Sequence, residues 1–254
     1  MLNYIKSEFY RITNTITIYV LTGILILMAI GLNVLICLFG NQYATTSFSY
    51  SNLVATPMIF TILGMVIAFF LYEGNRRYGS LKNTIASGIS RKKVFVGECI
   101  VSIITSTIIM VLVMFFWILT TTLLLKNAGP VTLKDLLLEV PATYLTAVAG
   151  VISGILLLEL CEKTSTGTVI WVVLWFIFPK ALLYLGIRFP SLYQAALWIP
   201  TNLFSVINNN HVNMSECITA WDTANGMFRC ILSGSAGVVL FSLIGILTLK
   251  RKDL

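Results

Sequence analysis

The densest group of charged side chains lies in residues 73–95, which read EGNRRYGSLKNTIASGISRKKVF. The flanking residues 12–72 and 99–125 contain no Asp, Glu, Lys or Arg. Six of the chain's 17 basic residues fall in this segment: Arg76, Arg77, Lys82, Arg91, Lys92 and Lys93. Such a cluster does not enter hydrocarbon, and guanidinium groups bind carboxylates or helix ends of a partner. The segment is therefore predicted to be a membrane-surface loop that contacts another molecule.

The other chemically capable side chains do not form a catalytic set. The only histidine, His211, lies among asparagines, and the chain has no GxxxxGK[ST] phosphate loop. Glu73, Glu98 and Glu159 all stand near predicted span ends on one side, which argues against an ion-coupled carrier or a charged channel. Lys180 is the one deep cation; it either faces a translocation path or extends to the outer interface.

Six membrane-spanning helices must position these residues. The chain is 57% hydrophobic and 11% charged, with a mean hydropathy of +0.91, which is typical of an integral membrane protein. The predicted fold is a single all-α membrane domain over residues 1–254. Its spans are expected at 16–39, 53–72, 94–125, 140–160, 166–187 and 230–249.

The distribution of basic residues orients these spans. With both termini cytoplasmic, 12 of the 17 lysines and arginines lie inside, as the positive-inside rule requires. These flanking positions account for the net charge of +7, so nucleic acid is not an expected partner.

The segments between spans carry further expectations. Residues 1–14 are predicted to form an amphipathic interfacial helix, or alternatively a simple extension of the first span. Residues 40–52 and 126–139 are predicted outer loops, the second with a short surface helix at 132–138. Residues 188–229 are an outer segment with short or re-entrant helices. The GxxxG spacing of Gly150 and Gly154 favours packing within the chain over dimerisation.

The five cysteines show no metal-ligand spacing. Cys217 and Cys230 are both predicted on the outer side. A disulfide between them would staple the outer segment, and the alternative is that both stay free.

Three pieces of the basic segment resemble a known family. Glu73, Gly79-Ser80-Leu81-Lys82 and Gly88-x-Ser90-Arg91 are similar to the loop between the second and third spans of bacterial ABC-2-type transporter permeases. Gly88 stands where the family commonly has proline, and Glu98 stands where a lysine often opens the third helix. In that family the loop carries a coupling helix that docks into the nucleotide-binding subunit.

The resemblance implies a permease subunit in a bacterial cytoplasmic membrane. ATP and Mg would be bound by a separate ATPase subunit, and this chain would hold no cofactor. The partners would be ATPase subunits, a second permease copy or paralogue, and the lipid bilayer. The cargo would be hydrophobic or amphipathic, such as an antimicrobial peptide, a lipid or a drug. The predicted contacts with the ATPase subunit are Glu73, Arg76, Arg77, Lys82, Gly88, Arg91, Lys92 and Phe95. The alternatives are a scaffold or sensor that recruits a cytoplasmic partner, and a secondary carrier.

Overall fold

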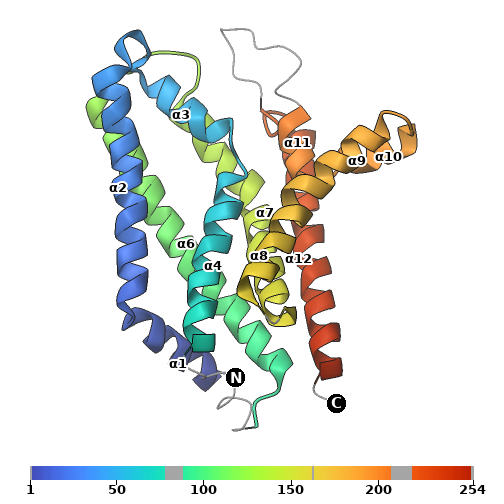
Figure 1. Cartoon of the computed structure of the whole chain (residues 1–254). Coiled ribbons are helices and arrows are strands. Elements are labelled where there is room, and N and C mark those ends of the chain that lie inside the picture. The colour runs from blue at the N-terminus through green and yellow to red at the C-terminus, as the bar shows by residue number, and fades with distance from the viewer. Residues whose placement is uncertain (1, 78–87, 162, 207–218, 253–254) are drawn as a thin grey trace.

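The structure is a computed structural model, and it describes residues 2–77, 88–161, 163–206 and 219–252 (Figure 1). All regular elements in these ranges are helical. They are α1 (Leu2–Thr13), α2 (Ile16–Phe39), η1 (Asn41–Tyr43), α3 (Thr46–Val54), α4 (Ile59–Arg77), α6 (Arg91–Leu124), α7 (Leu133–Leu160), α8 (Thr164–Val172), η2 (Val173–Ile177), α9 (Phe178–Gly186), α10 (Pro190–Ala196), α11 (Pro200–Val206) and α12 (Ala224–Lys252).

The helices have the length and apolarity of membrane spans. Five stretches pass this test alone: α2, α6, α7, the continuous run α8–η2–α9, and α12. A sixth span is formed if α3 and α4, which meet at a bend of 67°, are counted together. The chain is thus an all-helical, multi-pass membrane protein in the part that the structure describes. The first span falls on the predicted residues 16–39.

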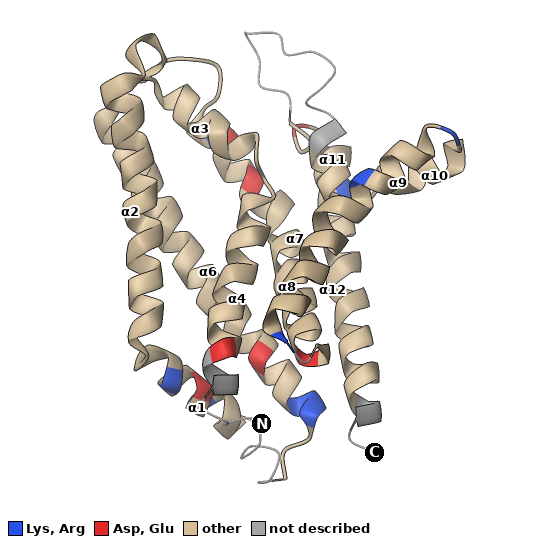
Figure 2. Cartoon of the chain, viewed as in Figure 1, with Lys and Arg blue, Asp and Glu red and all other residues tan. Residues whose placement is uncertain are grey.

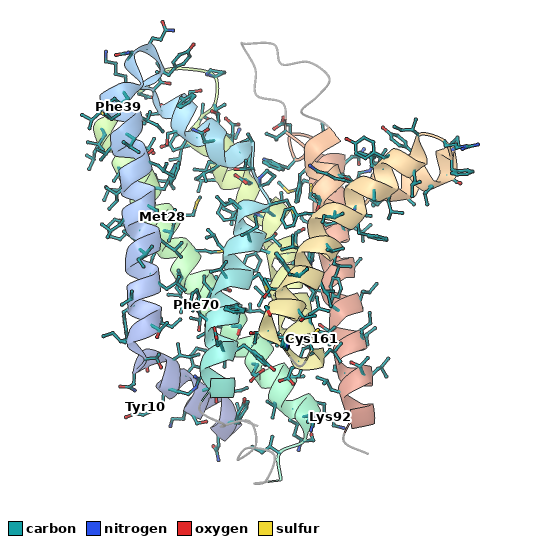
Figure 3. The ribbon with its side chains drawn as sticks, viewed as in Figure 1. Tyr10, Met28, Phe39, Phe70, Lys92 and Cys161 are labelled. Carbon is teal, nitrogen blue, oxygen red and sulfur yellow. The ribbon has the colours of Figure 1, made fainter. Side chains whose placement is uncertain are left out.

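Both chain termini lie at the same end of the bundle (Figure 1). Tyr10 of α1 and Lys92 of α6 also lie there, whereas Phe39 lies at the opposite end (Figure 3). We call the end that holds both termini the terminal end, and the opposite end the far end. Helix α1 lies across the terminal end instead of continuing α2, because the chain turns at Thr15, whose backbone is extended (φ −95°, ψ 118°). Helices α1 and α2 are therefore two separate helices with different directions.

Helix α7 is the centre of the bundle and packs against α4, α6, α8 and α12. In the most apolar stretch of α7, 67% is buried. In the corresponding stretch of α2, at the edge of the bundle, only 11% is buried. Gly150 faces Thr61 of α4 and the Trp171 ring of α8, and Gly154 faces Met65 of α4. The prediction that the GxxxG spacing serves packing within the chain is confirmed.

Gly150→Leu is expected to destabilise the monomer, because a larger side chain would push into Thr61 and Trp171. Overpacking a core costs about 1–3 kcal/mol. Thermal unfolding of the detergent-purified chain would measure the loss, and Gly31→Leu is the matched control, since nothing lies within 4 Å of a Cβ placed there. Equal midpoints for the two variants would contradict the internal packing role.

The far-end segment 40–52 is not the loop that its composition predicts. It contains η1 and α3, and its polar side chains are used locally. Thr45 caps α3 by accepting a hydrogen bond from the Phe48 amide (3.3 Å). Buried Ser49 donates to Asn33 of α2 (2.7 Å) and shares a 2.8 Å hydrogen bond with Thr121 of α6. Serine and threonine therefore tie α3 to its neighbours here instead of marking a solvated turn.

Two helices at the far end begin earlier than predicted. The expected surface helix at 132–138 is the first part of α7, which a capping box between Thr132 and Asp135 starts at Leu133. Helix α12 begins at Ala224, so Cys230 lies inside it, fully buried as a free thiol. Cys217 lies outside the described residues. The Cys230 side chain is enclosed in the apolar core, and its pairing with Cys217 stays a prediction.

The α-helical hydrogen bonding of the fifth span is interrupted at Pro179. Proline has no N–H to donate to the carbonyl of Trp175 four residues earlier. The hydroxyl of Thr201 on α11 donates to that carbonyl instead (2.7 Å), and Asn202 donates to the Pro179 carbonyl (2.8 Å). The π-helical turn η2 precedes the proline, and α9 and α10 then lean away from the bundle (Figure 1). Short helices in this segment match the expectation for residues 188–229.

Candidate functional site

The first turn of α6 presents basic side chains at the terminal end. Gly88 has φ +86°, a conformation that favours glycine, and Ser90 is extended (φ −65°, ψ 147°), so the chain turns sharply into the helix. Arg91, Lys92 and Lys93 then occupy its first turn, which contains no acidic residue. Positive charge at a helix N-terminus opposes the helix dipole, usually by about 0.3–1 kcal/mol per charge. These residues therefore do not serve the stability of α6 itself.

Acidic side chains gather behind this basic turn (Figure 2). Glu8 of α1 and Glu98 of α6 are nearly buried and line one narrow crevice together with Arg11. Arg11 and Glu8 form an ion pair at 2.7 Å. Burial, followed by the charges of Glu98 and Glu8, raises the pKa of the Tyr4 hydroxyl well above its ordinary value. Tyr4 stays neutral at physiological pH, and its ring packs against Gly97.

Helix α1 is anchored on α6 through a glycine. A Cβ on Gly97 would lie 2.7 Å from Cε1 and 2.8 Å from Cδ1 of the Tyr4 ring. Tyr4, Glu8 and Ile12 form the buried face of α1, spaced by four residues as a helix requires. Ile5 and Phe9 are partly buried beside this face, whereas Leu2 is 83% exposed.

Phe95 ties the same turn of α6 to the last helix. Its ring is 2% exposed, and a Cβ on Gly245 of α12 would lie 2.5 Å from it. The ring is enclosed within the chain, whereas the sequence predicted that Phe95 contacts a partner subunit. The base of α6 thus packs against both α1 and α12.

The other predicted contact residues fall in three groups. Glu73 is exposed near the end of α4. Arg91 and Lys92 are half-buried. Arg76 and Arg77 are the last residues of α4, so the helix runs further into the basic segment than predicted, and Lys82 lies outside the described residues. The expected coupling helix falls mostly in residues 78–87, also outside the described part.

Lys180 and Glu139 are two charged residues that lie outside the basic segment. Lys180 is exposed on α9, next to the Pro179 break. Glu139, assigned to an outer loop by sequence, is instead fully buried in α7, and neither carboxylate oxygen has a hydrogen-bond partner among the described residues. Thr143 and Thr146 follow it at helical spacing and are buried too, and this polar stripe was the available signal.

Within residues 2–77, 88–161, 163–206 and 219–252, no group of three His, Cys, Asp or Glu side chains is arranged to hold a metal ion. Comparison of the chain with protein-family models, with curated proteins and with solved structures gives no match. The function is therefore inferred from the geometry of the chain itself.

Proposed function

We propose that this chain is the membrane-spanning permease subunit of an ATP-driven exporter of hydrophobic or amphipathic cargo. The observation that carries the proposal is the basic first turn of α6. It joins α1 through Tyr4 on Gly97 and α12 through Phe95 on Gly245. A cytoplasmic ATPase subunit docked beside residues 88–93 would move α6, and these two contacts would pass the movement to both ends of the chain.

The architecture supports the proposal in two further ways. Helix α1 lies across the terminal end, where an interfacial helix of such a permease would lie. Helix α9 and the short helices α10 and α11 lie toward the far end, where re-entrant helices would lie. A second permease copy or paralogue would complete the transport unit, with both termini in the cytoplasm.

The test is ATP hydrolysis by the chain with and without co-purifying subunits. The tagged chain would be purified in mild detergent from the membranes that make it, and then stripped of partners with high salt. Hydrolysis is expected in the complex and is expected to be absent from the stripped chain, because the sequence has no phosphate-binding loop. Activity that stays with the stripped chain, or a native preparation that contains no ATPase subunit, would overturn the proposal.

A second candidate, an ion-coupled carrier, is favoured by Glu139 alone. Buried carboxylates without partners are costly in a membrane and mark ion or proton paths. The two candidates separate in sealed vesicles. Uptake of a labelled peptide antibiotic that follows an imposed pH gradient without ATP, and that Glu139→Gln abolishes, would favour the carrier. Uptake that needs ATP and survives Glu139→Gln would favour the exporter.

A further inference from the structure

An apolar cavity of about 490 Å³ lies between α12 and the interrupted fifth span. Its walls include Trp175, Pro179, Trp198, Leu240 and Phe241, and its volume is in the range of small-ligand sites. The space exists because α9 leans away from the bundle after Pro179, while the part of α12 facing it includes four small side chains. Those small residues are Ser233, Gly234, Ala236 and Gly237.

The cavity continues as a shallow groove, lined by α12 alone, along the exposed face of that helix. Both hollows share Leu232, Ala236 and Leu240, and the groove extends to Ile244. From residue 232 to residue 244 a helix rises about 18 Å, which is close to half of the ~30 Å hydrocarbon thickness of a bilayer. The hollow therefore has the length and the apolar lining that suit one acyl chain of a single leaflet.

Two basic residues stand next to residues that line the cavity. The Arg229 guanidinium lies 5.0 Å from the centroid of the Trp198 ring, and the hydroxyl of Ser233 holds that residue by donating to the Trp198 carbonyl (2.6 Å). Lys180 follows Pro179, which lines the cavity. Arg229 and Lys180 are both exposed, and neither forms an ion pair with a described residue. An anionic lipid has a negatively charged headgroup, which the basic side chains match, and an acyl chain, which the apolar hollow matches.

We propose that this hollow binds one anionic membrane phospholipid. Its acyl chain would fill the cavity and the α12 groove, and its phosphate would lie against Arg229 and Lys180. A peptide segment fits less well, because the walls offer few polar groups for its backbone. The site is independent of the proposed transport activity, since it needs only the membrane and this chain.

Quenching of tryptophan fluorescence by brominated acyl chains tests the site, because Trp175 and Trp198 line it. The full chain would be placed in vesicles of equal parts phosphatidylglycerol and phosphatidylcholine, with one lipid brominated at a time. Stronger quenching is expected from brominated phosphatidylglycerol. Replacing both Lys180 and Arg229 by Gln is expected to remove that preference, at about fivefold per basic side chain.

Two further variants separate the site from general effects. Arg188→Gln removes an exposed charge between α9 and α10 and should keep the preference. Ala236→Phe fills the cavity from an exposed position and should reduce quenching by both lipids without altering the charge. Equal quenching by the two lipids in the unmodified chain, or a preference that survives loss of Lys180 and Arg229, would overturn the proposal.

Discussion

Arg91→Glu is expected to lower ATP-dependent transport about tenfold or more, while the chain still reaches the membrane at its normal level. If an acidic surface of an ATPase subunit meets the first turn of α6, charge reversal places like charges together. Like charges placed together at an interface cost several kcal/mol of binding free energy. A loss of about 1.4 kcal/mol already lowers the affinity tenfold. The other basic residues of the segment keep the loop on its side of the membrane.

The helix itself should tolerate this change. A glutamate in the first turn of α6 interacts favourably with the helix dipole, whereas the present arginine does not. Loss of transport would therefore not come from loss of α6. This separates a partner contact from a structural role, which a substitution in the buried core cannot do.

The measurement is co-purification of the ATPase subunit together with ATP-driven uptake in inside-out vesicles. Lys126→Glu is the matched control, because it reverses an exposed charge at the far end of the bundle. Arg91→Glu should lose both partner and uptake, and Lys126→Glu should keep both. If the two variants behave alike with the partner bound, Arg91 is only an anchor of membrane orientation.

Gly97→Leu is expected to detach α1 from α6. The added side chain would occupy the place of the Tyr4 ring, whose atoms lie 2.7–2.8 Å from a Cβ at this position. Overpacking of about 1–3 kcal/mol corresponds to a shift of about 5-fold to 150-fold in the equilibrium for docking of α1. Hydrogen exchange of residues 2–13 should speed up by that factor, with the spans unchanged.

Two variants make this result specific. Gly23→Leu lies on α2, where nothing is within 4 Å of a Cβ, so it should leave exchange in α1 unaltered. If Gly97→Leu lowers cargo uptake by displacing α6, then adding Tyr4→Ala removes the ring that the new leucine meets. The double variant should therefore recover part of the uptake. Unchanged protection of α1 in Gly97→Leu would show that the Tyr4 contact does not hold that helix.

The terminal-end site illustrates what lay beyond sequence reasoning. The basic segment was visible in the sequence as a cluster of lysines and arginines. Phe95 adjoins the same cluster and was expected on the surface. Its burial depends on Gly245, which lies on a helix far along the chain. Local spacing carries no information about such a contact.

Glu139 shows the same limit at the far end. The charges of residues 126–139 and the Gly129-Pro130 pair predicted a solvated loop. The capping box at Thr132 instead starts α7 early and carries Glu139 into the core. A carboxylate in a sequence is expected to be exposed to solvent. Only the packing of the neighbouring helices shows that Glu139 is buried.

The sequence alone determined that the chain is a helical membrane protein, and it placed the first span on residues 16–39. Transfer of an apolar run into hydrocarbon depends on consecutive residues, so that free energy is local and readable. The tertiary structure decided which polar side chains are buried and where α12 leaves a hollow beside the broken fifth span. The burial of these side chains and the hollow depend on which helices contact one another. Contacts between segments that are distant in the sequence are set by the packing of the whole bundle.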